Sequence, residues 1–457
     1  MIVMKFGGTS VQDAEAIDRA AAIVRQRFAE QPVVVVSALA KITDQLLAMA
    51  AAAGASHREQ ALELCRAARE RHYNTAAELL GTQAFEQIAP ELESDFDGLE
   101  ELLRGVVAVG ELTLRTADTI AGFGERVSSK IAAAAFSQRG IDAAHVDSRR
   151  CIVTDANFGK AVPHFEETDA RLEQIVRPLV DRGQVPVMGG FIGSTREGMA
   201  TTLGRGGSDF SAAIVGAGLK AQRIEIWTDV DGMMTTDPNL CPAARRIKSI
   251  SFEEAAELAY FGAKVLHPAT LLPAVRKNIP VLILNSRNPR CDGTRITASA
   301  PKSRNTFRAI AAKKRITVVD VVATRMLMAH GFLKSIFEVF ANHRCPVDMV
   351  STSEVSVSVT VDSNESIAAV AADLARLADV KYEGRKAIVC LVGENIRNTP
   401  GIAARVFGSI GDVTIRMISQ GASEINISFV IDEADVPAVV TRLHETFFSQ
   451  VDPEVFA

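Results

Sequence analysis

The chain has 457 residues, of which 47% are hydrophobic and 23% are charged, and its formal net charge at pH 7 is −5. This length predicts two to four domains, and the composition is typical of a soluble globular protein. The negative charge and the lack of a long run of lysine and arginine argue against nucleic acid or an anionic membrane surface as a partner.

Cysteine usage and the N-terminus bear on the cellular compartment. The N-terminal residues become polar too early for the apolar core of a signal peptide, and no apolar run approaches the ~20 residues of a membrane span. The cysteines are scattered singly, which predicts reduced thiols rather than disulfides or a zinc site. We therefore expect a soluble, cytoplasmic protein. The six cysteines are Cys65, Cys151, Cys241, Cys291, Cys345 and Cys390.

The first predicted strand contains one charge, Lys5, and runs into the glycines Gly7 and Gly8 before a predicted helix at residues 11–28. A strand, a glycine turn and a helix in this order can place a lysine beside phosphates. The alternative is that Lys5 only solubilises an edge strand.

Four consecutive valines at residues 33–36 predict a buried parallel strand. Residues from about 45 to 120 are rich in Ala, Leu, Glu and Arg, which predicts several helices that line or cover a site. Glu125 lies at the start of the next helix. The helix dipole favours an acid there, but an inward-facing glutamate would instead bind a substrate ammonium.

Strands and helices then alternate, with strands predicted at residues 143–147, 185–191 and 223–228 and helices at 166–181 and 210–219. This alternation predicts a mostly parallel sheet with helices on both faces. Ligands of such sheets bind at the carboxyl ends of the strands.

A glycine-rich stretch at residues 201–213 reads as a cradle for phosphate. Its glycines allow close approach of an anion to the backbone, and Ser208 is expected to cap a helix whose N-terminus attracts negative charge. Arg205 offers a planar fork for a carboxylate or phosphate. The alternative is a tight turn without a ligand. The three glycines of this stretch are Gly204, Gly206 and Gly207.

Further candidate groups follow the strand at 223–228. Thr228 and Asp229 lie at its carboxyl end, and Ser251 with Glu254 forms a predicted capping box. Lys264 lies in the segment after that helix.

The C-terminal part contains an internal repeat. A polar, turn-rich linker spans residues 293–307, and similar segments then recur at an offset of 70 residues, from Gly331 to Gly401 and from Ser353 to Ser423. A duplicated small βαβ-type module after an enzyme predicts regulation or dimerisation.

Four motifs taken together resemble the aspartate kinases of the amino-acid kinase family, and the repeat resembles their tandem ACT domains. The motifs are KFGGTS (residues 5–10), TLGRGGSD (202–209), WTDVDG (227–232) and FGAKVLHP (261–268). The resemblance covers essentially the whole chain. The chain ends soon after the second repeat, so we expect the monofunctional kind without a homoserine dehydrogenase.

The resemblance implies an α/β fold, with an open, mostly parallel sheet sandwiched by helices, followed by two α+β ferredoxin-like ACT domains. We expect a catalytic domain at residues 1–297 with a helical insertion at about 45–120. The two ACT domains are expected at 313–384 and 385–457, and an interleaved arrangement, in which the last strand returns to the first domain, stays open.

The implied reaction transfers the γ-phosphoryl group of ATP, with Mg²⁺, to the side-chain carboxylate of L-aspartate and yields 4-phospho-L-aspartate. This is the first step towards lysine, threonine and methionine. Because the nucleophile is already an anion, positioning and positive charge are expected to dominate catalysis.

By this resemblance Lys5 neutralises the transferring phosphoryl group, and Asp209 orients Lys5 or the metal-bound phosphates. No residue is assigned as a direct metal ligand. The residues expected to bind aspartate are Thr43, Glu125, Arg205 and Ser208. Those expected to bind ATP are Lys5, Gly7, Gly8, Ser10, Thr228, Asp229, Met234 and Lys264, with Gly7 and Gly8 as backbone donors.

The chain departs from the family pattern at two positions. Met234 replaces a common aromatic residue, and Asn239 replaces a common arginine. Nucleotide contacts at these positions are therefore open, although methionine can still pack against an adenine.

The first repeat resembles the lysine-inhibited aspartate kinases. Asp348 and Glu354 supply the charge that an ammonium needs, and the alternative is that both are ordinary acids at strand ends. Inhibition by threonine, or by two amino acids together, stays open, as does a tetramer beyond the expected homodimer. The residues expected to line the effector site are Met326, Phe332, Leu333, Val347, Asp348, Ser353 and Glu354.

Two other functions remain. The chain could be another amino-acid kinase, which the tandem repeat argues against. It could also be a catalytically inactive amino-acid sensor, which the retention of Lys5, Arg205, Asp209 and Lys264 argues against.

Overall fold

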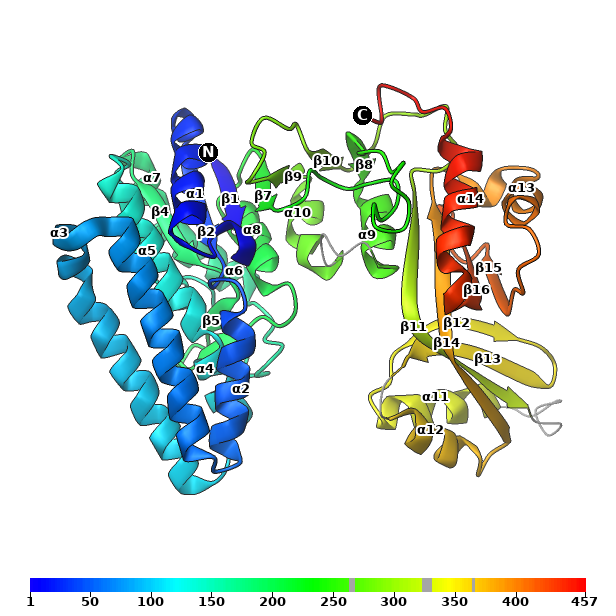
Figure 1. Ribbon diagram of the computed structural model, residues 1–457, viewed down its shortest axis with the longest axis horizontal. Coiled ribbons are helices and arrows are strands. Elements are labelled where there is room, and N and C mark those ends of the chain that lie inside the picture. Colours follow the sequence, from blue (N-terminus) through cyan, green and yellow to red (C-terminus); the bar gives the residue numbers. More distant parts are fainter. Residues whose placement is uncertain (263–267, 323–330, 364–365) are drawn as a thin grey trace. The chain divides into compact units, whose positions relative to one another are not determined.

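The computed structural model describes residues 1–262, 268–322, 331–363 and 366–457. The chain divides into two compact units, Met1–Met233 with Leu266–Ala300 and Met234–Val265 with Pro301–Ala457 (Figure 1). The expected catalytic domain at 1–297 therefore loses residues 234–265 to the second unit. Thr235 shows why, because its hydroxyl lies 2.9 Å from Nε2 of His444 and its carbonyl accepts the N–H of Ile310 at 2.7 Å.

A parallel sheet forms the centre of the first unit. Its strands follow the order β3-β4-β2-β1-β7-β9, and β10 pairs antiparallel with β9. All four valines of β2 are fully buried, as the sequence predicted. The strands are β1 (Ile2–Phe6), β2 (Pro32–Val36), β3 (Ala143–Val146), β4 (Val185–Gly189), β7 (Ile224–Thr228), β9 (Val281–Asn285) and β10 (Thr294–Thr297).

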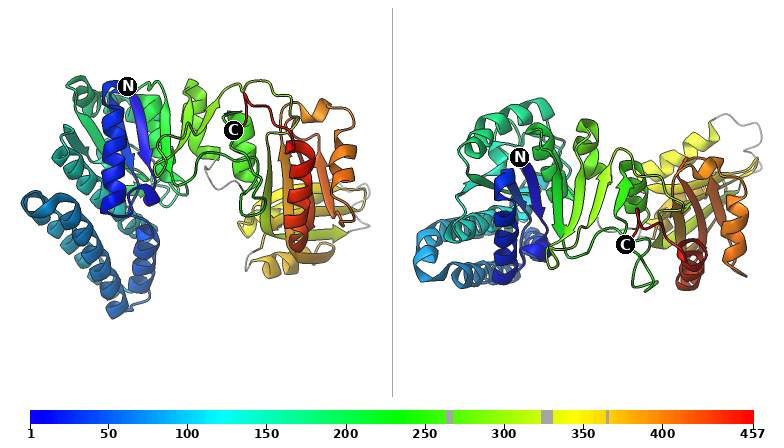
Figure 2. Two further views of the ribbon diagram at one scale, coloured as in Figure 1. Left: turned by 45° about the horizontal axis from the view of Figure 1, so that its top comes forward. Right: turned by 90° about the horizontal axis from the view of Figure 1, so that it is seen from above.

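Helices cover both faces of this sheet (Figure 2). On one face α5 (Phe123–Gln138) packs on β2, β3 and β4, next to α1 (Ala14–Gln26). On the other face α8 (Gly207–Gly218) packs on β1, β2 and β7, next to α6 (Phe165–Ile175) and α10 (Leu272–Lys277). The helix predicted at 166–181 is interrupted at Val176, and Pro178 occupies the first turn of α7 (Arg177–Asp181).

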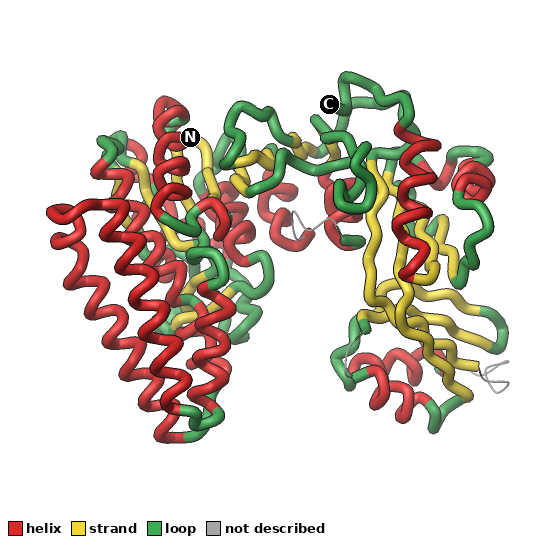
Figure 3. The backbone as a smooth tube through the Cα atoms, viewed as in Figure 1, coloured by secondary structure: helices red, strands yellow, loops and turns green. Residues whose placement is uncertain are grey.

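The region from residue 42 to 121 is helical. It contains α2 (Ile42–Gly54), α3 (Arg58–Val109) and α4 (Leu114–Ala121). The long α3 is a hairpin of two helices (Figure 3), because Gly81 has a φ of 66° and Arg69 pairs with Asp97 at 2.6 Å across the fold. A separate small hairpin, β5 (Ile192–Ser194) with β6 (Ala200–Thr202), leads into α8.

The second unit contains a six-stranded sheet in the order β12-β13-β11-β14-β16-β15. Its strands are β11 (Ala309–Val322), β12 (Val347–Thr352), β13 (Ser356–Asp362), β14 (Asp379–Val392), β15 (Met417–Gln420) and β16 (Asn426–Asp432). Its helices are α9 (Phe252–Tyr260), α11 (Phe332–Asn342), α12 (Ile367–Leu374), α13 (Ile402–Ser409) and α14 (Val436–Phe448), and the short β8 (Ser249–Ser251) precedes α9. The predicted capping box of α9 is present.

The two repeats share their long strands. Residues 316–322 of β11 pair with β13 of the first repeat, whereas residues 309–313 pair with residues 388–392 of β14, next to β16 of the second. The interleaving of the repeats, which the sequence left open for the last strand, is made here by the first strand, β11. The last strand, β16, stays with β14 and β15 of its own repeat.

Matching backbone details identify the duplication. Gly331 and Gly401 precede α11 and α13 as N-caps in the left-handed conformation, with φ of 86° and 73°. Ser353 and Ser423 each accept the N–H two residues further on at 3.3 Å. Of the described helices, none has the length and apolar character needed to cross a membrane.

Candidate active site

Lys5 and Asp209 form an ion pair at the carboxyl end of the central strand. Side chains alternate along β1, and Val3 faces α8, where a Cβ added to Gly216 would lie 3.8 Å from Val3 Cγ2. Lys5 shares that face of the sheet. Its Nζ lies 2.7 Å from Oδ1 of Asp209 in the first turn of α8, and the two side chains are only 10% and 13% exposed. The structure therefore brings the two predicted catalytic residues together.

The glycine-rich loop sets the start of α8. Gly204 and Gly206 have φ of 75° and 73°, and Gly206 is the N-cap of the helix without a side-chain cap. The expectation that Ser208 caps the helix is wrong, because Ser208 is inside it and packs against Gly190. The first N–H groups of α8 thus lack a side-chain acceptor, which is the usual arrangement at helix N-termini that bind anions.

Gly7 and Gly8 differ in what their backbones can donate. The N–H of Gly7 donates to the carbonyl of Trp227 at 3.0 Å, so it is not available for the phosphate contact expected of it. A Cβ at Gly7 would lie 3.4 Å from Nζ of Lys5, so this glycine leaves room for the ammonium. Within the described residues no acceptor is recorded for the N–H of Gly8.

Ser10 joins the ends of three strands. It is buried, and its Oγ lies 2.8 Å from Oγ of Ser286 and 3.3 Å from the carbonyl of Trp227. These bonds tie the loop after β1 to the ends of β7 and β9. The hydroxyl is therefore engaged by the protein in this structure, although the sequence assigned it to ATP.

Glu125 is a buried carboxylate with an unpaired oxygen. The residue is 3% exposed, and its Oε2 has no hydrogen-bond partner among the described residues. Burial raises the pKa of Glu125 to about 7, although backbone N–H groups, including that of Ala38, and the charge of Lys5 act in the opposite direction. A buried polar oxygen without a partner is costly, so the position favours a cationic ligand over the helix-dipole interpretation.

The other expected contacts of the first unit lie in loops or first turns near the strand ends. Thr43 is half-buried in the first turn of α2, and Arg205 is exposed with no partner recorded among the described residues. The hydroxyl of Thr228, at the end of β7, lies 3.2 Å from Oδ1 of the exposed Asp229. Within the part of the chain that the structure describes, the side chains of Thr43 and Arg205 therefore have polar groups that a ligand could contact.

Of the three remaining positions named in the sequence, Met234 and Asn239 belong to the second unit and Lys264 lies outside the described residues. Met234 forms an isolated β-bridge with Arg246. The backbone N–H and side-chain amide of Asn239 both donate to Asp237 at 2.9 Å.

Asp118 was not identified from the sequence, yet it supports the glycine-rich loop. It is buried on α4, where Oδ2 accepts the N–H groups of Gly159 at 2.9 Å and Thr202 at 2.8 Å, and Oδ1 accepts the hydroxyl of Thr202 at 2.8 Å. Thr202 ends β6, two residues before Gly204. No local pattern reveals this role, because the partners are 41 and 84 residues away.

In the first repeat, Asp348 is already paired within the chain. Nζ of Lys313 lies 2.9 and 2.8 Å from its two oxygens and 3.0 Å from Asp362, and the hydroxyl of Tyr260 donates to Asp348 at 2.8 Å. Burial opposes the charged form of Lys313, but the bonds to Asp348 and Asp362 outweigh it and raise its pKa. The sequence did not indicate Lys313 or Tyr260 as partners.

The remaining expected effector residues are less engaged. Phe332 and Val347 pack on the core of the repeat, and Leu333 is 42% exposed. The hydroxyl of Ser353 lies 2.7 Å from that of Ser356, and Glu354 is exposed. Met326 lies outside the described residues.

Comparison with known proteins defines the class. Residues 1–285 match the Amino acid kinase family, and residues 319–372 and 389–447 match the ACT domain. The first match spans more than half of the chain, so the chain belongs to the amino acid kinase family.

Its relatives are aspartokinases. Lysine-sensitive aspartokinase 3 of Escherichia coli (strain K12) is 37% identical over 461 residues, covering 98% of this chain and 99% of that protein. Aspartokinase 2, chloroplastic, of Arabidopsis thaliana is 38% identical over 469 residues, covering 99% and 85%. Within its family the chain is therefore an aspartokinase, an ATP-dependent kinase, which confirms the class and activity predicted from the motifs.

Solved structures agree with this placement. E. coli aspartokinase III in complex with aspartate and ADP superposes with a TM-score of 0.86 at 36% identity, covering 98% of this chain and 100% of that one. The same enzyme in complex with lysine and aspartate gives a TM-score of 0.84 at 36% identity, covering 98% and 99%. The predicted fold class is thus confirmed.

Proposed function

We propose that this aspartate kinase carries out its reaction at the carboxyl end of β1, with Lys5 and Asp209 at the reacting phosphate and Glu125 at the ammonium of L-aspartate. The observation that supports this assignment best is the unpartnered Oε2 of Glu125. It is buried close enough to Lys5 for the ammonium charge to act on its pKa. One edge of the sheet thus offers a cation for a phosphate and an anion for an ammonium.

The chemistry needs no general base. A side-chain carboxylate oxygen of aspartate forms a bond to the γ-phosphorus, and the bond from that phosphorus to the oxygen bridging it to the β-phosphate breaks, so that ADP leaves with the electron pair. Two anions must be brought together, so positive charge and alignment lower the barrier. Lys5 supplies the charge, Asp209 orients its ammonium, and the exposed guanidinium of Arg205 receives the α-carboxylate.

The proposed cofactor Mg²⁺ would enter with the nucleotide. Mg²⁺ in kinases is held mainly by phosphate oxygens and water, with only one or two protein carboxylates, and when bound it neutralises charge on the phosphates. The ion pair of Asp209 with Lys5 fits this arrangement, because it places a single carboxylate beside the phosphate position. Thr228 and Asp229 are proposed nucleotide contacts at the end of β7.

A comparison of two acceptors tests the role of Glu125. Succinate has both carboxylates of aspartate but no ammonium, so in a hydroxamate assay with Mg-ATP its kcat/KM should fall at least about 100-fold below that of L-aspartate. Glu125→Gln should remove most of that preference. Glu166→Gln, an exposed glutamate in the first turn of α6, is the matched control and should retain it. Equal use of both acceptors by the unmodified enzyme contradicts the assignment.

We further propose L-lysine as the inhibitor, bound at the first repeat around Asp348. This rests on the similarity to the E. coli lysine-sensitive enzyme and on a carboxylate that already holds an ammonium, that of Lys313. The enzyme would act in the cytoplasm, where cysteines stay reduced, at the first step towards lysine, threonine and methionine.

We propose a homodimer formed through the ACT region. The edge strand β12 carries Val350, which is 45% exposed, and Leu333 on α11 is 42% exposed. An unpaired edge with apolar side chains is a typical surface for a second copy. Light scattering should give twice the chain mass, and Val350→Lys should shift it towards the monomer. A monomeric unmodified enzyme would exclude this proposal.

A further inference from the structure

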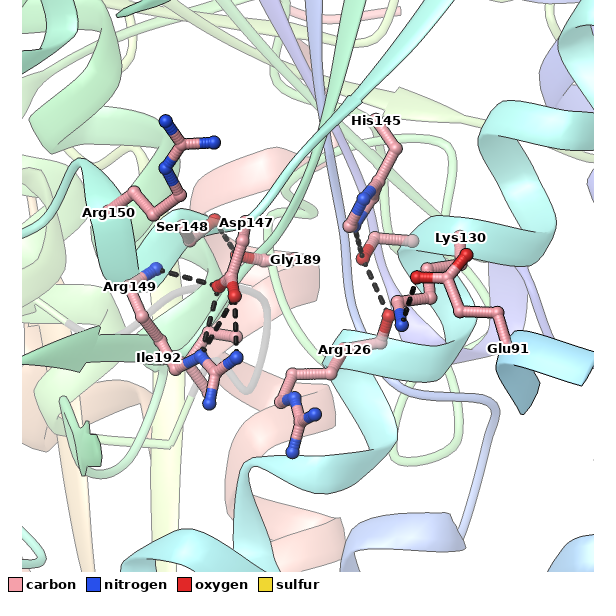
Figure 4. Close-up of a pocket in the computed structure, with 11 residues that line it drawn as sticks. Glu91, Arg126, Lys130, His145, Asp147, Ser148, Arg149, Arg150, Gly189 and Ile192 are labelled. Atoms are coloured by element: carbon pink, nitrogen blue, oxygen red, sulfur yellow. Dashed lines mark hydrogen bonds and ion pairs between the residues drawn. The ribbon is translucent and has the colours of Figure 1, made fainter. Parts of the chain in front are cut away.

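A charged cavity of about 220 Å³ lies at the carboxyl ends of β3 and β4 (Figure 4). It lies between α5, one residue of α3 and the turn that follows β3. None of the residues proposed to bind aspartate, ATP or lysine lines it. The function of the enzyme therefore leaves this cavity unexplained.

Two cations of α5 enter the cavity from one side. Arg126 and Lys130 share the carboxylate of Asp95, at 3.0 and 2.6 Å, and Lys130 also lies 2.6 Å from Glu91. These contacts use only Nη2 of Arg126. For its Nε and Nη1 no acceptor is recorded among the described residues.

Two more cations come from the turn after β3. Arg149 is held by Asp147, with Nε 3.0 Å from Oδ1 and Nη2 2.5 Å from Oδ2, and this leaves its Nη1 without a recorded acceptor in the described chain. Arg150 is exposed, and its guanidinium has no hydrogen-bond or ion-pair partner among the described residues. Burial and the charge of Lys130 lower the pKa of His145, which favours the neutral form of this fifth basic group.

The cavity therefore has more positive than negative charge. Four permanent cations face three carboxylates, and the excess is concentrated where Arg126 and Arg149 meet. Figure 4 shows their guanidinium groups next to each other. Burial, and then the charge of Arg149, lower the pKa of Arg126. Two guanidinium groups that lie close together repel each other, and an anion between them would offset this repulsion.

We propose that this cavity binds a small oxyanion, a phosphate or a short dicarboxylate, between the guanidinium groups of Arg126 and Arg149, with Arg150 as a third donor. Planar guanidinium forks match the paired oxygens of such anions. The cavity, at about 220 Å³, has room for a small ion. This inference does not rest on the proposed roles of the catalytic residues.

The cavity adjoins the proposed aspartate position. Arg126 follows Glu125 on α5, and Gly189 of the lining packs so closely on Glu125 that an added Cβ would lie 2.7 Å from its carbonyl oxygen. An anion bound here would hold Arg126, and with it the first turn of α5 next to Glu125. We therefore expect the bound anion also to lower the KM for L-aspartate.

Titration calorimetry tests the site with inorganic phosphate and, separately, with succinate. Saturating Mg-ADP and L-aspartate are present so that the nucleotide and substrate positions are filled. We expect one equivalent of at least one of these anions to bind, and binding to weaken about tenfold or more in Arg149→Gln and in Arg150→Gln. Arg150→Gln removes no recorded ion pair, so its folding should be unaffected, which a thermal melt checks.

The matched control is Arg104→Gln. It removes a surface arginine that pairs with Glu100 within α3, and it should leave anion binding unchanged. Two results would overturn the proposal. One is that neither anion binds the unmodified enzyme. The other is that binding is equally strong in both cavity variants, which would place the anion elsewhere. Because binding is measured without turnover, either result is distinct from a failure of the kinase assignment.

Discussion

If Glu125 binds the ammonium of aspartate as proposed, aspartate binding should depend on pH. The pKa of Glu125, about 7, results from burial, so below about pH 7 the side chain is mostly the neutral acid and cannot pair with an ammonium. We therefore expect kcat/KM for L-aspartate to rise with pH and to level off above about pH 7. A pH profile with Glu125→Gln as the comparison checks this, because the variant should lack that ionisation. An unchanged profile in the variant would assign the ionisation to another group.

The same residue makes a stability prediction. The folded-state pKa lies above the ordinary value of 4.5, so the folded protein holds this proton more tightly than the unfolded chain. The free energy of unfolding contributed by Glu125 must then decrease as pH rises from about 4.5 to about 7, and stay low above that. In urea unfolding, the free energy of unfolding of Glu125→Gln relative to that of the unmodified protein should increase between these pH values, by at most about 3 kcal/mol. A constant difference would contradict the raised pKa.

Asp118 is expected to act as a positioning residue. Asp118→Asn replaces the carboxylate by a neutral amide. The amide oxygen can still accept the N–H groups of Gly159 and Thr202, but the amide nitrogen takes the place of the oxygen that accepts the Thr202 hydroxyl, and the remaining bonds are no longer to a charged group. Hydrogen bonds to a charged group contribute about 1.5–3 kcal/mol, so we expect the KM for L-aspartate to rise about tenfold. Steady-state kinetics measures this, and kcat should change less than KM.

Asp155 offers the matched control for this substitution. Its Oδ1 also accepts two backbone N–H groups, from Asn157 at 3.1 Å and Val162 at 2.9 Å, but these bonds are exposed and stay within one loop. Asp155→Asn should therefore leave the KM near that of the unmodified enzyme. An equal rise in both variants would mean that the whole loop, and not the bond to β6, controls the substrate position.

At this scale the sequence identified residues that belong to local patterns. Lys5 and Asp209 follow a strand and a glycine-rich loop, and their pairing is a consequence of strand alternation. Asp118 and Lys313 were missed because their partners are distant in sequence and no sequence pattern indicates them. The bonds of Gly7 and Ser10 to the ends of neighbouring strands were not foreseen, because their partners, Trp227 and Ser286, are distant in sequence.

At the scale of elements, the start of α8 depends on Gly206. Its φ of 73° is costly for any residue with a Cβ, by about 1–2 kcal/mol. Gly206→Ala should therefore shift the first turn that carries Asp209 and lower kcat/KM, together with a modest loss of thermal stability. Gly98→Ala, at an exposed position in α3 with open space around it, should keep activity and slightly raise stability. Full activity in Gly206→Ala would exclude a role for this helix start.

The elements themselves were largely predictable because their signals are local. The buried valine strand and the capping box of α9 were identified, and the repeat offset located two equivalent glycine N-caps. The turn at Gly81 that folds α3 into a hairpin was not anticipated, because the sequence around it stays helical in character. The sequence left open an interleaving of the repeats but did not locate it at β11, since strand partners are set by tertiary pairing.

At the scale of the whole molecule, inhibition requires that the effector bind the inactive arrangement more tightly than the active one. In the first repeat the ammonium of Lys313 occupies Asp348, and Asp348 also accepts a bond from Tyr260 on α9. If L-lysine binds at Asp348 as proposed, its ammonium competes with that of Lys313 for this carboxylate. On that proposal, Lys313 acts as an internal competitor of the inhibitor.

Lys313→Met should remove that competition. We expect the lysine concentration for half-inhibition to fall about tenfold, because the effector no longer breaks a charged hydrogen bond when it binds. Lys386→Met is the matched control, since Lys386 holds Asp432 in the same way but in the second repeat. It should leave inhibition by lysine unchanged. If instead Lys313→Met abolishes inhibition while the protein stays folded, the ammonium of Lys313 is part of the inhibited state and not a competitor of the effector.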